Sequence, residues 1–117
     1  MKPSSAKNKG RLLQQHVAQL LREAFGLDED DVQSRSMGAD GEDLLLSPHA
    51  RRLFPFAVEC KNTRGFPGTP ALEQAKANRR TYCPVVMWKP GGKGMNKTIA
   101  MFYLEDFVKA WQSKGPE

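Results

Sequence analysis

The sequence has little of what defines several classes of protein. Its 117 residues include only two cysteines, Cys60 and Cys83, with no Cys-x-x-Cys spacing and no set of histidines beside them. We therefore expect reduced thiols, not a disulfide framework or a zinc site. No apolar run approaches the ~20 residues that a membrane-spanning helix needs, and no apolar segment directly follows the basic N-terminus, which argues against a signal peptide. These absences predict a cytoplasmic protein without a membrane partner.

The length is typical of one domain that buries its own core without disulfides or structural metals. We expect a flexible basic arm at residues 1–9, a single domain at residues 10–112 and a short tail at residues 113–117.

Charge is distributed unevenly along the chain. Residues 1–43 contain six lysines and arginines and eight acids, a net charge of −2. Residues 44–117 contain twelve lysines and arginines and five acids, a net charge of +7. A basic surface with a local acidic cluster is typical of a protein that holds a polyanion and a metal ion. Ordinary solubility charge is the alternative interpretation.

Hydrophobic periodicity and turn residues predict a helix, three strands, a helix, two strands and a closing helix. The expected helices cover residues 9–25, 70–80 and 105–111, and the expected strands cover residues 32–37, 43–47, 53–61, 85–88 and 98–104. Three consecutive strands favour an antiparallel meander, and the helix after them favours a further strand laid parallel in the same sheet. The expected fold class is α/β, with a mixed (α+β) sheet flanked by helices.

Local signals support these elements. The first helix ends before Gly26 and has one apolar stripe, made of Leu13, Val17, Leu20, Leu21 and Ala24. The four adjacent acids at residues 28–31 would repel one another around a metal, so we expect a solvated connector there. Residues 48–52 should form a turn, and Thr69 should cap the second helix, with Pro70 at its first position.

Glu59 and Lys61 lie two residues apart at the end of an apolar run that begins at Phe54. Alternate side chains of a strand point to the same face, so these two charges should point the same way. Asp43 directly precedes three leucines, and it reaches Glu59 if the two apolar runs are neighbouring strands. Two acids and one ammonium would then converge where the strands end.

Such a cluster suits a hard divalent cation. Mg²⁺ prefers oxygen ligands and keeps several waters, so we expect Asp43, Glu59 and the backbone carbonyl of Cys60 to hold Mg²⁺, for which Mn²⁺ can substitute. Such a site could hydrolyse a phosphodiester. Lys61 would then orient or deprotonate the attacking water, or stabilise the phosphorane, and the sequence leaves these roles open. The alternatives are a surface Glu-x-Lys pair or an ion pair without metal, although charges beside a core need a partner to offset their desolvation.

This pattern resembles the PD-(D/E)xK nuclease superfamily. The match consists of Asp43 before a short apolar strand and Glu59-Cys60-Lys61 after a hairpin, within the predicted order of elements. The resemblance implies a restriction-endonuclease-like αβββαβ core and a Mg²⁺-dependent DNA endonuclease that hydrolyses phosphodiester bonds. Gly41-Glu42 replaces the proline that precedes the acid in the literal motif. Glu42 thus competes as a metal ligand, but alternation should turn it away from Asp43.

The small size and the opening segment resemble phage-encoded and archaeal-type Holliday junction resolvases, which often carry an acid in the first helix. Here Gln14 and Gln15 occupy that place, and Gln14, at the edge of the apolar stripe, is the better candidate for a catalytic role. His16 is expected at the surface or the boundary of the helix, with a role as a base as the alternative. Gln74 either corresponds to a polar residue on the helix after the motif or is simply solvated. The resemblance implies DNA recombination, a homodimer and, for a phage-encoded protein, the host cytoplasm.

Basic residues from several segments can surround the proposed site. The candidates for DNA binding are Lys9, Arg11, Arg64, Arg79, Arg80, Lys93 and Lys97. Phosphate contacts of this kind give affinity without sequence reading, and no helix-turn-helix or zinc-finger pattern is present. Branched or single-strand-containing DNA is therefore the expected partner. Phe66 either stacks on an opened base or caps the core, and Trp88 and Trp111 are assigned to packing.

Two other functions stay open. One is a nicking, homing or exonucleolytic enzyme of the same superfamily. The other is a non-catalytic DNA-binding module on the same fold, which the two glutamines of the first helix support best.

Overall fold

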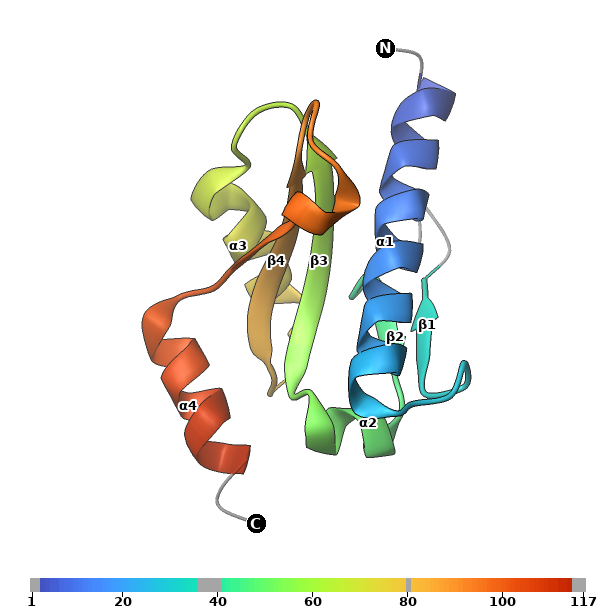
Figure 1. Cartoon of the computed structure of the whole chain (residues 1–117). Helices are drawn as coiled ribbons and strands as arrows, with labels where there is room; N and C mark the ends of the chain where they lie inside the picture. Colours follow the sequence, from blue (N-terminus) through green and yellow to red (C-terminus); the bar gives the residue numbers. More distant parts are fainter. Residues whose placement is uncertain (1–2, 36–40, 80, 115–117) are drawn as a thin grey trace.

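The computed structural model describes residues 3–35, 41–79 and 81–114 (Figure 1). Its elements follow the predicted order, with an additional short helix after the second strand. They are α1 (Pro3–Phe25), β1 (Val32–Ser34), β2 (Leu44–Leu46), α2 (Pro48–Leu53), β3 (Phe56–Thr63), α3 (Gly68–Ala77), β4 (Cys83–Pro90), the 3₁₀ turn η1 (Met95–Lys97), β5 (Ile99–Met101) and α4 (Leu104–Lys114).

A three-stranded mixed sheet forms the centre of the molecule. β3 and β4 pair in parallel from Phe56, beside Cys83, to Thr63, beside Pro90, and β5 pairs with β4 antiparallel. Parallel neighbours need a crossover connection, and α3 supplies it between β3 and β4. The predicted α/β class and the predicted parallel strand are both confirmed.

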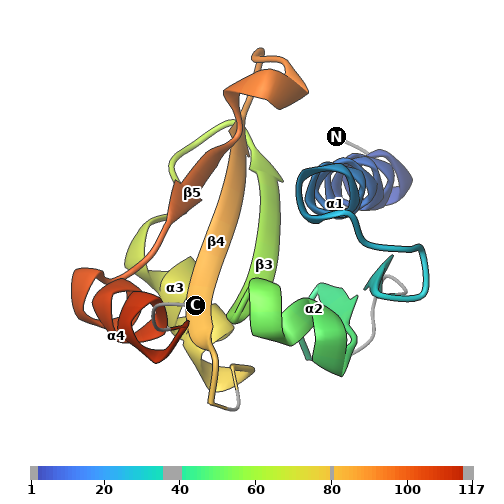
Figure 2. The same ribbon diagram turned by 60° about the horizontal axis from the view of Figure 1, so that its bottom comes forward.

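The two faces of this sheet carry different layers. α1 covers one side, and α3 and α4 lie on the other (Figure 2). The α1 side buries Val58 and Val85 among the apolar residues of α1, whereas Val86 packs beneath α3 with Ala71, Leu72 and Ala75. Strand alternation therefore turns the side chain of Glu59, which lies beside Val86, towards the α3 face.

β1 and β2 form a separate antiparallel pair in the part of the chain that the structure describes. The prediction of one meander through three strands is wrong at this point. A single backbone bond, from the Asp43 N–H to the Val58 carbonyl at 2.9 Å, links the start of β2 to β3. β2 has only three residues, and α2 follows at once, so the chain turns away before a ladder with β3 can form.

The short helix α2 replaces the turn predicted at residues 48–52. Ser47 accepts a hydrogen bond from the Ala50 N–H at 3.1 Å, and Pro48 occupies the first helical turn. A side-chain N-cap followed by proline is a strong helix start. Ser47-Pro48 is therefore a sequence signal for a helix and not for the predicted turn.

Several boundaries also differ from the predictions. α1 begins at Pro3, so residues 3–9 continue the helix instead of forming a flexible arm. α3 begins at Gly68, which places Thr69 inside the helix, and no side chain caps it. Met37 and most of the turn predicted at residues 38–41 lie outside the described residues.

The buried stripe of α1 is shifted from the predicted one. Leu13, Val17 and Leu21 are buried as expected, but Leu20 and Ala24 are exposed, and Gln14 is buried in their place. Trp111, assigned to packing, is 70 % exposed on α4. The described residues contain no helix that is long and apolar enough to cross a bilayer, and Cys60 and Cys83 are both buried free thiols.

A buried ion pair anchors the segment that leads into β2. Arg51 of α2 donates to both carboxylate oxygens of Glu42, at 2.7 and 2.9 Å, and to the Phe56 carbonyl at 2.8 Å. The side chains of Arg51 and Glu42 are only 10 % and 6 % exposed, and the guanidinium lies 4.1 Å from the centre of the Tyr82 ring. One arginine thus ties together the residue before Asp43, the start of β3 and the segment before β4.

Removal of Arg51 should destabilise the fold strongly. Arg51→Met leaves the buried Glu42 carboxylate without its cation, and breaking a buried pair from one side costs about 3 kcal/mol or more. Urea unfolding at neutral pH measures this loss. Arg52→Met, at an exposed neighbour on the same helix, should change the unfolding free energy by less than about 0.5 kcal/mol.

The double variant Glu42→Gln with Arg51→Met should recover much of the loss, because no unpaired charge remains buried. A single variant as stable as wild type, or a double variant less stable than Arg51→Met alone, would contradict this account of the pair.

Candidate active site

Asp43 bridges to the free edge of β3 through two hydrogen bonds. Its N–H donates to the Val58 carbonyl at 2.9 Å, and its Oδ2 accepts the Cys60 N–H at 2.7 Å. The other edge of β3 is paired with β4, so Asp43 occupies the side that the sheet leaves open. This places its carboxylate beside the middle of β3.

Glu59 and Lys61 project from β3 to the same face, as predicted. The Lys61 ammonium lies 3.7 Å from Glu59 Oε1 and donates to Gln74 Oε1 of α3 at 3.1 Å. The Lys61 side chain is 29 % exposed, whereas that of Glu59 is 6 % exposed. Gln74, for which the sequence left two interpretations open, therefore contacts the lysine of the cluster. We call Asp43, Glu59, Lys61 and the backbone of Cys60 the β3 site.

Both carboxyl groups of the β3 site resist ionisation. Burial, followed by the nearby charge of Asp43, raises the pKa of Glu59 from 4.5 to about 7, against the opposing effect of Lys61. Burial also raises the pKa of Asp43, while the Cys60 N–H, Lys61 and Arg35 oppose that rise. Asp43 is therefore close enough to disfavour the charge of Glu59, and the partly exposed Lys61 does not fully offset the rise in the pKa of Glu59.

Cys60 contributes its backbone to the site, not its thiol. Burial raises the pKa of the thiol well above its ordinary value of 9.0, and the charges of Asp43 and Glu59 raise it further. In a strand, the N–H and C=O of one residue point to the same side. Because the Cys60 N–H reaches Asp43 across the open edge, the Cys60 carbonyl faces that edge as well.

Two carboxylates and one carbonyl form a donor set that fits Mg²⁺ or Mn²⁺. Mg²⁺ keeps several waters and needs few protein ligands, and a cation would offset the charge repulsion between the two acids. Among the described residues, no three His, Cys, Asp or Glu side chains come together as a metal site. The fit therefore depends on Asp43, Glu59 and the Cys60 carbonyl alone.

Glu42, the competing ligand, is held elsewhere. Arg51 engages both of its carboxylate oxygens, and Arg35 donates to its backbone carbonyl. In α1, Gln14 is buried and Gln15 is exposed, while His16 lies at the boundary between core and solvent. A catalytic role for Gln14 stays a prediction.

Much of the predicted DNA-binding set gathers at one end of the sheet. Asn62, near the end of β3, donates to the Lys9 carbonyl of α1 at 3.0 Å, and the neighbouring Arg11 is exposed. Arg64, in the loop after β3, packs against Gly91 of the hairpin between β4 and β5. That hairpin carries the exposed Lys93 and Lys97, and Figure 1 shows it beside the β3–α3 loop.

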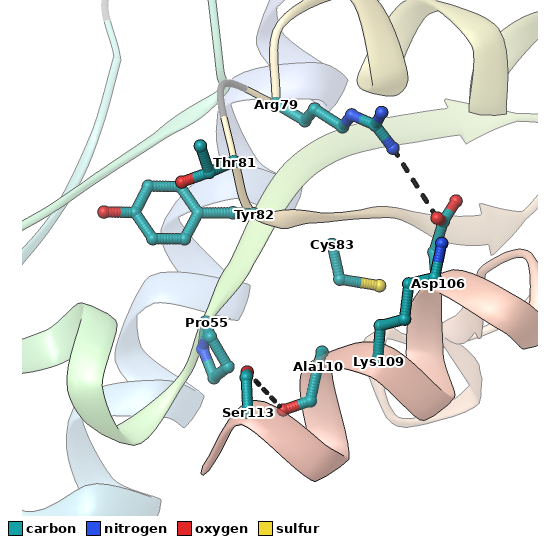
Figure 3. Close-up of a pocket in the computed structure, with 9 residues that line it drawn as sticks. All are labelled: Pro55, Arg79, Thr81, Tyr82, Cys83, Asp106, Lys109, Ala110 and Ser113. Carbon is teal, nitrogen blue, oxygen red and sulfur yellow. Dashed lines mark hydrogen bonds and ion pairs between the residues drawn. The ribbon is translucent and has the colours of Figure 1, made fainter.

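Arg79 is not brought to this end. It lies before β4, 3.6 Å from Asp106 of α4, and the two line a cavity of about 620 Å³ that also includes Cys83 and Lys109 (Figure 3). Burial raises the pKa of the Cys83 thiol to about 11, so it stays protonated at neutral pH. Arg80 lies outside the described residues.

Two arginines near the β3 site were not predicted from the sequence. Burial raises the pKa of Asp43, and Arg35 is one of the groups that oppose this rise. Arg35 also holds the segment before Asp43 through the Glu42 carbonyl, and Arg51 pairs with Glu42 itself. Neither belongs to a local motif. Only the capping pattern at Ser47-Pro48 hinted that residues 48–53 form a helix able to aim Arg51 inward.

Scans against protein-family models, curated proteins and solved structures gave no match.

Glu59→Gln should stabilise the metal-free protein at alkaline pH. Between pH 4.5 and about pH 7 the unfolded chain has released the Glu59 proton while the folded protein keeps it. Because the folded state binds more protons in this window, its stability falls as the pH rises. In EDTA at pH 8 the glutamine variant should exceed wild type by about 2 kcal/mol, and the gain should vanish towards pH 4.5.

Urea unfolding across this pH range measures the difference. Glu29→Gln, in the exposed acidic connector, should differ from wild type by a small amount that does not change with pH. A Glu59→Gln variant that is less stable than wild type at pH 8 would show that the Glu59 carboxylate is well compensated without a cation.

Proposed function

We propose that this protein is a Mg²⁺-dependent DNA endonuclease of the PD-(D/E)xK type, structure-selective in the manner of Holliday junction resolvases. One observation supports the proposal above all others. The Asp43 carboxylate accepts a hydrogen bond at 2.7 Å from the N–H of Cys60, the residue between Glu59 and Lys61. This contact brings the carboxylate of Asp43, the residue before β2, to the part of β3 that carries Glu59 and Lys61.

The residues of the β3 site would divide the work of phosphodiester hydrolysis. Asp43, Glu59 and the Cys60 carbonyl would hold a divalent cation, which supplies Lewis-acid activation of water and offsets charge on the phosphate. Lys61 is the partly exposed cation of the site, so its ammonium could reach the scissile phosphate or orient the attacking water. The Lys61 ammonium donates a hydrogen bond to Gln74 Oε1, which directs the ammonium.

The DNA would lie across the end of the sheet where Lys9, Arg64 and the hairpin lysines gather. Lysine and arginine contacts to phosphates bind DNA without reading its sequence and weaken steeply with salt. This supports a branched or single-strand-containing substrate over a sequence-specific one. The buried free thiols support a reducing, cytoplasm-type compartment.

A homodimer would place two sites for the paired cuts that resolution of a junction needs. The outer face of α4 exposes Leu104, Val108 and Trp111, which a second copy of the chain would cover.

Cleavage should depend on Asp43 and on a divalent cation. We expect wild type to cut a four-way or flapped DNA in Mg²⁺ or Mn²⁺ and to stop in EDTA. Asp43→Asn and Lys61→Ala should each lower the single-turnover rate by at least about 100-fold, the usual loss when one stabilising group is removed. Gel analysis of labelled strands measures the rate.

Asp30→Asn and Lys76→Ala are matched controls, because both residues are exposed and lie outside the β3 site; they should cut at the wild-type rate. Equal cutting of plain duplex would replace the resolvase assignment by a less selective nuclease. Wild type that shows neither cleavage nor calorimetric heat with Mn²⁺, even with DNA present, would favour a non-catalytic DNA-binding module.

A further inference from the structure

Phe66 is a large aromatic side chain that the fold leaves in solvent beside the β3 site. It is 69 % exposed, so it does not cap the core. A single exposed apolar residue is ordinary on a protein surface. What distinguishes Phe66 is how it is held, where it lies and which charges surround it.

The loop that carries Phe66 is held by contacts on both sides. The Thr63 hydroxyl donates to the Gly65 carbonyl at 2.8 Å, and the Trp88 indole N–H donates to the Thr63 carbonyl at 3.0 Å. The Phe66 ring meets the Trp88 ring edge to face, with centroids 5.4 Å apart and planes at 73°. The Phe66 ring is therefore exposed to solvent and at the same time held in place by its neighbours.

Two glycines allow this placement. A Cβ on Gly91 would lie 2.7 Å from the Arg64 Cα, so only glycine lets the hairpin pack against the Phe66 loop. Gly68 has a φ of +65°, a backbone conformation that other residues rarely adopt, and so allows the chain to turn from the Phe66 loop into α3. The Phe66 ring contacts Trp88, and most of its surface faces water.

Phe66 and Lys61 lie on the same side of the sheet. Trp88 is the direct strand neighbour of Lys61, and partners in register point to the same face. That face is the α3 side, since Lys61 bonds to Gln74 of α3 and Trp88 packs against the core under α3. One indole ring therefore separates Phe66 from the strand position of the proposed reactive lysine.

The charge around Phe66 is positive. No acidic residue occurs in the sequence from Cys60 to Leu72 or from Cys83 to Leu104, and these segments carry Lys61, Arg64, Lys89, Lys93 and Lys97. An aromatic ring framed by cations is the arrangement with which proteins bind single-stranded nucleic acid: cations hold phosphates, and the ring stacks on a base.

We propose that Phe66 stacks on an unpaired base of single-stranded or branch-point DNA, while Arg64 and the hairpin lysines hold the adjacent phosphates. This inference rests on the proposed function for its DNA substrate and adds the feature that selects it. Bases inside a continuous duplex are stacked on each other and cannot meet the ring. The protein therefore prefers DNA with open bases, and the preference resides in binding.

Equilibrium binding in EDTA tests the proposal apart from cleavage. Fluorescence anisotropy with labelled oligo(dT) and with a plain duplex of equal length should show that Phe66→Ala loses about 5- to 30-fold in affinity for oligo(dT). Its affinity for duplex should change less than about twofold. A 2-aminopurine base at the branch of a flapped DNA should be quenched by wild type and not by this variant.

Phe66→Trp and Phe66→Leu separate stacking from apolar packing. The tryptophan variant should bind oligo(dT) like wild type, and the leucine variant, which keeps bulk against Trp88 and Gly68, should lose affinity like alanine. Leu20→Ala, at an exposed apolar residue of α1 outside the proposed contacts, should leave both affinities unchanged.

The proposal is overturned if Phe66→Ala binds oligo(dT) as tightly as wild type, if both DNA forms lose affinity equally, or if Phe66→Leu retains full affinity. The last outcome would assign the ring to an apolar protein contact. If wild type binds open DNA through Phe66 but never cleaves it, the proposed nuclease function is contradicted and the role of Phe66 in binding is retained. Wild type that cleaves but shows no dependence on Phe66 would do the reverse.

Discussion

The hydrogen bond from the Cys60 N–H to the Asp43 carboxylate is the constraint on which the rest of the site depends. β3 pairs with β4 on one edge only, so its other edge carries backbone groups that need partners. Asp43 supplies both an N–H and a carboxylate there, in place of a strand ladder. Because a side chain and not a strand satisfies this edge, one of the Asp43 oxygens and the Cys60 carbonyl stay available beside Glu59.

The fold treats two neighbouring acids in opposite ways. Glu42 is paired with Arg51 of α2, whose Nη2 donates to both carboxylate oxygens. Asp43, one residue later, raises the pKa of Glu59, and the two acids share a partly exposed lysine, Lys61. Burial of charge without a close counterion is costly, so the proposed cation would stabilise this arrangement. Arg51 also matters to the site, because its pairing with Glu42 fixes the backbone from which Asp43 extends.

The two ends of the sheet differ in their surfaces. At the end where β3 finishes, the loop bearing Phe66, the glycine-rich hairpin and the first half of α1 come together. These segments are distant in sequence, and all of them are basic. At the opposite end, Arg79 is engaged by Asp106 around a cavity beside α4. Five of the seven basic residues predicted to bind DNA, namely Lys9, Arg11, Arg64, Lys93 and Lys97, thus belong to the segments at the end where β3 finishes.

The sequence by itself determined the order of elements, the α/β class and the common face of Glu59 and Lys61, because these follow from local periodicity and from the alternation of a strand. It also indicated Asp43 as their partner. Only the tertiary structure decided how Asp43 arrives: by a side-chain bond to an open edge, with β2 in a separate sheet. It alone revealed the Arg51–Glu42 pair, the displacement of Arg79 from the site and the exposure of Phe66. These depend on contacts between segments far apart in the chain, whose free energies no local pattern encodes.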